Sequence, residues 1–231
     1  MKFLFDPEPV RAAEVQGASA QYPVRRIFCV GRNYAEHARE MGGEVDREAP
    51  FYFTKSALAL TPSGATVPYP PGTGDYHHEM EFVIALGAPA FRIATKDALG
   101  VVFGYACGLD MTRRDLQAAA KEKRRPWDIG KDFEHSAVLG AITRAEDFAP
   151  VGPQAISLSV NRAPRQAARL ADMVWSVAEI ISHLSTLYHL GPGDLIYTGT
   201  PAGVGPVVPG DVLDGKIDGL GPLRLVIGAA E

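Results

Sequence analysis

The segment DYHHEMEFVIALG, residues 75–87, combines the pattern of a buried β-strand with two closely spaced carboxylates. Side chains on a strand point alternately to its two faces. The even-numbered positions carry mostly apolar side chains that suit a hydrophobic core: His78, Met80, Phe82, Ile84 and Leu86. The odd-numbered positions carry two acids and then small apolar side chains: His77, Glu79, Glu81, Val83 and Ala85. A strand suited to burial therefore holds two like charges on one face.

Those two charges need either a proton or a bound cation if the strand is buried. Two ionised carboxylates side by side repel when water is excluded, so one takes a proton or a cation lies between them. Mg²⁺ and Mn²⁺ favour such oxygen ligands. Asp110, which ends the apolar run VVFGYACGLD, offers a third carboxylate. The alternative is an edge strand with solvated glutamates and an aspartate that caps a turn. The continuous apolar run after Glu81 favours the buried strand.

The bulk properties of the chain exclude several classes of protein. Its 231 residues, 46% of them hydrophobic, suit one globular domain with a substantial core. A net charge of −4 gives no general attraction to nucleic acid or acidic membranes. No apolar run is long enough to span a bilayer, and MKFLFDPEPV becomes acidic too early for a signal peptide. Cys29 and Cys107 lie in apolar runs and suit buried free thiols in a reducing cytoplasm.

The pattern along the chain predicts many short strands and three helices. Eighteen prolines and 24 glycines separate the strands. Helices are expected at 32–43, which ends at a glycine pair, at 112–123 and at 171–191. In the second, Thr112 is expected as the N-cap and Asp115 completes a capping box. The core faces expected of the first and third helices are Tyr34, His37, Ala38 and Met41, and Val177, Ile180, Ile181, Leu184 and Tyr188.

Other polar residues suit catalysis, although each has a simpler interpretation. His37 and Glu40 lie three residues apart on one helix face, where a carboxylate would orient an imidazole and raise its basicity. Such a pair suits activation of water, but charged surface helices hold similar pairs. Lys131 could stabilise an oxyanion or could simply be solvated. Thr198 and Thr200 begin a glycine-rich turn and could donate to a carboxylate together with backbone N–H groups of that turn.

Five motifs together resemble the fumarylacetoacetate hydrolase superfamily, and they occur in that superfamily's order. They are IFCVGRNYAEHAREMG, YHHEMEF, GYACGLDMTRRDLQ, PWDIGKDFEHSAVLG and GDLIYTGTPAGVG. The resemblance extends from Tyr22 to the last residue. It implies an α+β, mainly β fold, a mixed β-roll with a few peripheral helices, as a single catalytic domain at 22–231 after a short segment at 1–21. It also implies a homodimer.

The resemblance assigns a role to each candidate residue. It implies that Mg²⁺ or Mn²⁺ binds to Glu79, Glu81 and Asp110. The first helix is implied to be a lid that brings His37 and Glu40 to the substrate, and Lys131 is implied to be catalytic. The implied substrate-binding residues are Arg32, Arg114, Gln117 and Thr200.

The implied reaction is hydrolysis of a C–C bond in a 2,4-dioxo acid. His37 activates water, which attacks C4, and the metal and Lys131 stabilise the pyruvate enolate that leaves. Fumarylpyruvate, cleaved to fumarate and pyruvate during aromatic catabolism, is the favoured substrate. Decarboxylation of oxaloacetate, and the isomerisation or decarboxylation of a 2-hydroxyhepta-2,4-diene-1,7-dioate, use nearly the same residues. A non-catalytic binding module is a third possibility, which the intact metal set together with His37 and Glu40 disfavours.

Two positions depart from the superfamily pattern. Lys55-Ser56 replaces the usual Lys-Pro, which puts a role for Lys55 in doubt. Val160-Asn161-Arg162 replaces Val-Asn-Gly in a hairpin that often needs positive φ, although Asn161 tolerates that conformation.

Overall fold

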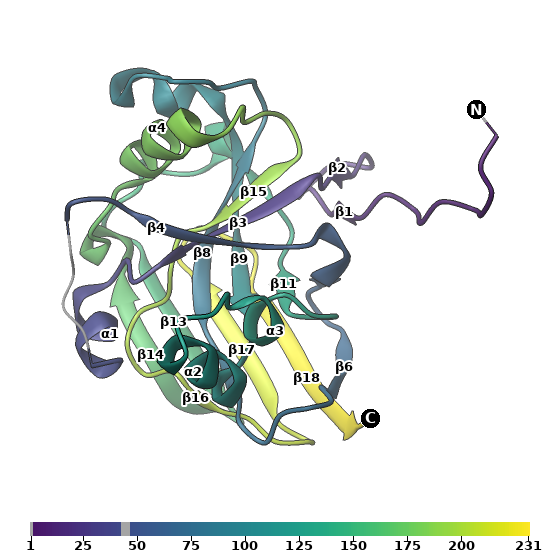
Figure 1. Cartoon of the computed structure of the whole chain (residues 1–231). Helices are drawn as coiled ribbons and strands as arrows, with labels where there is room; N and C mark the ends of the chain where they lie inside the picture. Colours follow the sequence, from purple (N-terminus) through teal and green to yellow (C-terminus); the bar gives the residue numbers. More distant parts are fainter. Residues whose placement is uncertain (1, 43–46) are drawn as a thin grey trace.

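A mixed sheet of eight strands forms the centre of the fold (Figure 1). The computed structural model describes residues 2–42 and 47–231. The strand order is β4-β3-β15-β8-β9-β11-β5, and β12 pairs with β9 beside β11. The β3/β15 and β5/β11 pairs are parallel, whereas the other pairs are antiparallel. The strands are β3 (Arg26–Gly31), β4 (Phe51–Lys55), β5 (Leu60–Pro62), β8 (Met80–Leu86), β9 (Val102–Asp110), β11 (Ala137–Leu139), β12 (Thr143–Arg144) and β15 (Asp194–Tyr197).

Three smaller sheets complete the β structure. The largest has five strands in the order β14-β13-β17-β18-β6. Its strands are β6 (Thr66–Tyr69), β13 (Ala155–Val160), β14 (Ala163–Arg169), β17 (Val212–Ile217) and β18 (Leu223–Ala230). The others are the pair β1 (Ala12–Ala13) and β2 (Tyr22–Pro23), and the sheet of β7 (Tyr76–His78), β10 (Thr112–Arg113) and β16 (Gly205–Pro206). The mainly β fold with few helices is the one expected from the sequence.

Strand β8 is buried on both faces and joins two hydrophobic clusters. Its even-numbered residues, such as Phe82, pack in the larger cluster with Leu158 and Leu225 of the five-stranded sheet. Its odd-numbered residues, such as Val83, pack in a second cluster with Tyr197. Because both faces contact apolar side chains, any carboxylate on this strand must be compensated within the protein.

The prediction of one strand over 75–87 is wrong at Glu79, where the chain changes sheets. Strand β7 belongs to the three-stranded sheet, and β8 to the eight-stranded sheet. The Met80 N–H donates to Gln166 Oε1 at 3.0 Å, while the Glu79 carbonyl accepts the Asp110 N–H at 2.9 Å. The side chain of Gln166 thus replaces a neighbouring strand as the hydrogen-bond partner of Met80. The chain can therefore leave one sheet and enter the other at this point.

The helices lie at the periphery of the sheets (Figure 1). The α-helices are α1 (Ala35–Glu40), α2 (Arg114–Glu122), α3 (Asp128–Lys131) and α4 (Val177–Leu187), and the short 3₁₀ helices are η1 (Ala57–Ala59), η2 (Thr95–Val101), η3 (Ala145–Asp147) and η4 (Leu170–Asp172). Three α-helices were expected from the sequence, but α3 was not. No helix in the described part of the chain is long and apolar enough to cross a membrane.

The expected helix ends are only partly correct. Helix α1 is shorter than predicted, and Gly43 of the expected glycine pair lies outside the described residues. The N-cap prediction for α2 is wrong, because Thr112 lies in β10 and the Asp115 carboxylate accepts hydrogen bonds from Thr73 and Gly74 instead.

The predicted core face of α4 is wrong only at its last residue. Val177, Ile180, Ile181 and Leu184 are buried, whereas Tyr188 is 41% exposed just after the helix ends. Cys29 and Cys107 are buried free thiols, as predicted.

Candidate active site

Three buried carboxylates meet where β8 and β9 lie side by side. Glu79 precedes β8, Glu81 lies within it and Asp110 ends β9. The antiparallel register pairs Met80 with Leu109, which brings Asp110 opposite Glu79. One oxygen from each carboxylate lies within 4.8 Å of the others, and each residue is at most 5% exposed.

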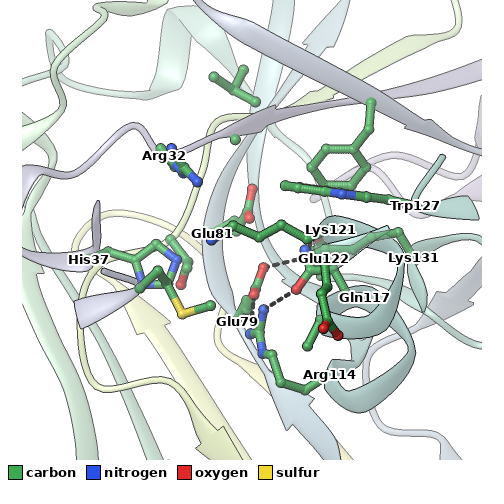
Figure 2. A pocket seen from close by; sticks show the side chains of 17 residues that line it. Arg32, His37, Glu79, Glu81, Arg114, Gln117, Lys121, Glu122, Trp127 and Lys131 are labelled. Atoms are coloured by element: carbon green, nitrogen blue, oxygen red, sulfur yellow. Dashed lines mark hydrogen bonds and ion pairs between the residues drawn. The ribbon is translucent and has the colours of Figure 1, made fainter. Parts of the chain in front are cut away.

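Three cations from three other elements surround these carboxylates, and Figure 2 shows two of them, Arg114 and Lys131. Lys131 Nζ of α3 donates to Glu79 Oε2, Asp110 Oδ2 and Thr112 Oγ1, each at 2.7 Å. Arg114 of α2 pairs with Glu79 Oε1 and donates to Gln117 Oε1 at 2.5 Å. Lys55 Nζ, at the end of β4, lies 2.8 Å from Asp110 Oδ1 and donates to the backbone carbonyls of Met111 and Lys131.

The surroundings shift the pKa values of the two glutamates in opposite directions. Burial alone would raise the pKa of Glu79, but the charges of Lys131 and Arg114 outweigh it and lower the pKa. Burial raises the pKa of Glu81 well above its ordinary value, and the charges of Asp110 and Glu79 raise it further. The Gly199 N–H, 2.7 Å from Glu81 Oε2, is the hydrogen bond that favours the ionised form. Glu81 therefore holds the least compensated charge of the three.

The donor set fits a hard divalent cation. All three groups are carboxylates, which Mg²⁺ and Mn²⁺ prefer. Among the described residues, Asp110 Oδ1 is buried without an aligned hydrogen bond, although Lys55 lies close to it. A carboxylate oxygen without an aligned hydrogen bond, beside a glutamate whose charge is poorly compensated, is the arrangement that a metal ion would complete.

His37 and Glu40 form the pair expected from their spacing. His37 Nδ1 lies 3.1 Å from Glu40 Oε2, and His37 is 6% exposed. The Glu40 carboxylate also accepts the Gly203 N–H at 3.1 Å, which ties α1 to the turn before β16. A carboxylate at Nδ1 favours the tautomer with its proton there, so Nε2 is left as the basic nitrogen. His37 lines the same cavity as the three carboxylates.

This cavity has a volume of about 420 Å³ and includes nearly all the predicted site residues. Figure 2 shows Arg32 and His37 on one side of Glu79 and Glu81, and the residues of α2 and α3 on the other. The residues expected in the site that line the cavity are Arg32, His37, Glu79, Glu81, Asp110, Arg114, Gln117, Lys131 and Thr200. Glu40 lies behind His37. Arg32 holds φ at 59°, a left-handed conformation that is uncommon for arginine.

The threonines of the glycine-rich turn differ from expectation. Thr198 Oγ1 donates to the Phe82 carbonyl, and Thr200 Oγ1 donates to the Met80 carbonyl, each at 2.8 Å. Thr200 also accepts from Gln166 Nε2 at 2.8 Å. Because their protons are held by the backbone of β8, these hydroxyls are not free to donate to a ligand carboxylate. The N–H of the turn that does bind a carboxylate belongs to Gly199, and its partner is Glu81.

Sequence reasoning undervalued Lys55, which is 3% exposed and lies against Asp110. A charge count would have indicated it. Three buried carboxylates need three cations, and Arg114 and Lys131 supply only two. A backbone N–H of this turn was expected to donate to a carboxylate, but Glu81 was not expected as the partner of Gly199. The φ of Gly199 is +95°, and a Cβ at this position would lie 2.8 Å from Asn33 Cβ, so only glycine fits there.

Comparison with known proteins shows that the chain is a member of the fumarylacetoacetate hydrolase family. The family model described as fumarylacetoacetate (FAA) hydrolase C-terminal matches residues 26–227. The chain is 51% identical to a fumarylpyruvate hydrolase of Ralstonia sp. over 193 residues, 83% of this chain and all of that protein.

Other relatives have related activities. A fumarylpyruvate hydrolase of Pseudomonas aeruginosa, solved in complex with Mn²⁺ and pyruvate, is 46% identical with a TM-score of 0.95, covering 99% of this chain and 100% of that one. An oxaloacetate tautomerase of Escherichia coli is 38% identical over 206 residues, 88% of this chain and 93% of that protein.

Proposed function

We propose that this protein is a metal-dependent hydrolase that cleaves fumarylpyruvate to fumarate and pyruvate. The observation that carries the proposal is that His37, paired with Glu40, lines the same cavity as the three carboxylates. A base for water and a site for a hard cation are the two parts that C–C hydrolysis of a 2,4-dioxo acid needs. The 51% identity to the Ralstonia fumarylpyruvate hydrolase supports the choice of substrate.

The charges of the site suit a substrate whose pyruvate part becomes a dianion during the reaction. Glu79, Glu81 and Asp110 balance Lys55, Lys131 and Arg114 in formal charge. A divalent cation then adds two positive charges, which the carboxylate and the enolate oxygen of a leaving pyruvate neutralise. A site that becomes neutral only when the enolate forms stabilises the transition state more than the ground state.

Each side chain then has its own role in the proposed reaction. Glu79, Glu81 and Asp110 would hold Mg²⁺ or Mn²⁺, which would supply Lewis-acid polarisation of the substrate's 2-oxo group. His37 takes a proton from water through Nε2 while Glu40 holds its Nδ1–H. The water oxygen attacks C4, the C3–C4 bond breaks, and its electron pair forms the enolate of pyruvate. Lys131 stabilises this charge, and a proton added at C3 yields pyruvate while the other fragment leaves as fumarate.

Tautomerisation or decarboxylation of oxaloacetate is the second candidate function. The 38% identity to the oxaloacetate tautomerase supports it, and these reactions need the cation and an enolate but no attacking water. The position of His37 in the cavity favours hydrolysis.

A substrate panel tests the proposed function. Purified protein is stripped with EDTA, reloaded with Mg²⁺ or Mn²⁺, and assayed with fumarylpyruvate, acetylpyruvate and oxaloacetate. We expect EDTA to abolish cleavage of fumarylpyruvate and either ion to restore it. Full activity after exhaustive chelation would contradict the proposal that the reaction needs a metal ion. Turnover of oxaloacetate but not of fumarylpyruvate or acetylpyruvate would contradict the proposal that the protein is a hydrolase.

The His37→Ala variant separates the two candidate reactions. Loss of a general base typically lowers a rate by about a hundredfold to ten-thousandfold. We expect a loss of this size for fumarylpyruvate cleavage and a much smaller one for any oxaloacetate decarboxylation. Glu40→Gln should follow the same pattern more mildly. Equal loss of both activities in a variant that still binds Mn²⁺ would remove His37 as the water-activating base.

We also propose the cellular setting of the enzyme. The buried free thiols of Cys29 and Cys107 suit a reducing compartment, so a cytoplasmic enzyme of aromatic catabolism is the setting that we infer, with Mg²⁺ as its metal. Residues 22–231 would form the catalytic domain and 1–21 a short N-terminal segment.

We propose further that the enzyme is a homodimer. Strand β4 lies at one edge of the eight-stranded sheet, and a groove beside it is lined by Phe51, Trp127 and Tyr188. Phe51 is 45% exposed and Tyr188 41%. An exposed sheet edge with apolar side chains suits pairing with a second copy.

A further inference from the structure

The cations that line the active-site cavity fall into two groups. Arg114 and Lys131 are paired with Glu79, and Lys131 also with Asp110. Arg32 and Lys121 line the cavity too, but within the described residues their side chains have no ion pair or hydrogen bond. The paired cations already have carboxylate partners, and one of them, Lys131, is placed beside the enolate in the proposed mechanism. The unpaired cations are therefore available to a ligand.

We propose that Lys121, together with Arg32, binds a second carboxylate at the far end of the substrate's acyl group. This inference rests on the proposed function, in which the pyruvate part of the substrate lies against Glu79, Glu81 and Asp110. Fumarylpyruvate carries a second carboxylate at the end of its fumaryl chain, away from the pyruvate part. That group needs a cation outside the Glu79 cluster, and Lys121 and Arg32 are the cavity's unpaired cations among the described residues.

The rest of the cavity wall agrees with such a ligand. Phe53 and Trp127 line it, and their flat rings suit a planar unsaturated chain. The arginine supplies a planar fork that matches a carboxylate, and its left-handed φ of 59° is an unusual backbone conformation of the kind found at ligand sites. Lys121 lies on α2, three and four residues beyond Ala118 and Gln117, so these three share the helix face that lines the cavity.

Glu122 is the one feature that opposes an anion here. Its side chain also lines the cavity and has no partner within the described residues. Adjacent residues on a helix point in different directions, so Glu122 need not pair with Lys121. The unpaired groups sum to one positive charge, from Arg32 and Lys121 against Glu122. The subsite therefore attracts a single distal carboxylate.

The test compares a substrate that has the distal carboxylate with one that lacks it. Lys121→Met keeps the length of the side chain and removes its charge. We expect KM for fumarylpyruvate to rise about tenfold or more, the usual effect of losing a charge-assisted contact, with kcat nearly unchanged. KM for acetylpyruvate, which has no second carboxylate, should change less than twofold. Arg32→Asn, which tolerates the left-handed backbone, should shift the same ratio in the same direction.

Lys123→Met is the matched control. It removes the same charge from the end of the same helix, but Lys123 does not line the cavity. It should leave both KM values unchanged. Equal effects of Lys121→Met and Lys123→Met would show general electrostatic attraction and overturn the subsite, as would equal effects of Lys121→Met on the two substrates. Absence of fumarylpyruvate cleavage in the unmodified protein would instead refute the proposed function.

Discussion

The site needs Lys55, which the motifs did not indicate, because the buried carboxylate of Asp110 requires a positive charge beside it. Lys55 lies in a protein interior where an unpaired carboxylate is costly, and its neighbour Asp110 is 1% exposed. The contact between them joins residues that are 55 positions apart in the chain. Lys55 is therefore a structural counter-ion for the carboxylate cluster, whatever further role it has with substrate.

Lys55→Met tests this role. Removing one partner of a buried ion pair costs about 3–5 kcal/mol of the free energy of unfolding. We expect a loss of this size in metal-free protein and a smaller loss with saturating Mn²⁺, because the ion replaces the missing charge beside Asp110 and stabilises the native state. Thermal unfolding with and without Mn²⁺ measures both. Lys96→Met, at an exposed position, is the control, and a loss independent of Mn²⁺ would contradict the prediction.

The proximity of the carboxylates could be predicted from the sequence, but that of the cations could not. Glu79 and Glu81 are two residues apart, so local geometry alone keeps them together. Lys55 and the Gly199 N–H reach the cluster through the pairing of β4 with β3 and of β15 with β8, and no local pattern specifies that pairing. For Lys131 the sequence left a solvated residue and an oxyanion stabiliser as alternatives, and only the family motif decided between them. The short helix α3 that carries it has too few residues to show a periodicity.

Among the elements, the turn of the β13–β14 hairpin holds a strained backbone conformation at a position where the sequence already indicated it. Its two-residue turn holds Asn161 at φ 52° and Arg162 at φ 68°. Both positions of such a turn need positive φ, and Asn161 suits it because its side chain accepts the Val212 N–H at 2.9 Å. Arg162 has no such compensation for its backbone conformation among the described residues.

Arg162→Gly should therefore stabilise the protein. Relief of the left-handed conformation contributes about 1–2 kcal/mol, and the greater freedom of glycine in the unfolded chain offsets about 1 kcal/mol of it. We expect a gain of up to about 1 kcal/mol, measured by urea unfolding. Ala167→Gly, at an exposed position in the regularly paired part of β14, is the matched control and should be destabilising. Equal losses from both changes would contradict the explanation.

The parallel pair β3 and β15 depends on one buried acid. Asp194 is fully buried at the start of β15 and accepts hydrogen bonds from Arg25 and Arg26 at 2.7–3.0 Å. Burial alone would raise the pKa of Asp194, but the hydrogen bonds from Arg26 and Arg25 outweigh it and lower the pKa. A lowered pKa contributes stability above the ordinary aspartate pKa, and this contribution disappears as the pH falls through the lowered value.

Asp194→Asn should remove that contribution. We expect a loss of at least about 2 kcal/mol at pH 7, because the two guanidinium groups lose their counter-ion. The difference from the unmodified protein should stay constant down to about pH 4 and shrink below it. Urea unfolding at a series of pH values checks this, with Asp6→Asn as an exposed control. A difference that grows as the pH falls would have the wrong sign.

On the scale of the whole molecule, sequence alone predicts the class of fold better than its topology. Alternation identified β8 and its two faces, and both faces are buried as two clusters. The change of sheet at Glu79 depends on Gln166, which is 86 residues from Met80 and 88 from His78 and contacts both. Such a long-range contact leaves no trace in the periodicity of residues 75–87, which is that of one strand.

The groove beside β4 leads to the prediction about assembly. Ile129 and Leu187 lie next in sequence to the groove residues Asp128 and Tyr188, and they are 61% and 58% exposed. If two copies pair through this face, the native protein should have twice the monomer mass by light scattering. Charges in a buried apolar contact are strongly unfavourable, so Ile129→Lys with Leu187→Lys should shift it to monomer while the fold is retained by circular dichroism.

Val208→Lys provides the matched control for this double variant. Val208 is an apolar residue of similar exposure, 57%, that does not line the groove. It should leave the dimer intact, because a lysine there remains in contact with water. A dimer that persists in the double variant would mean that the copies pair through another face. If the native protein is monomeric at micromolar concentration, the homodimer proposal is wrong. The exposed edge of β4 would then be protected only by its own aromatic side chains.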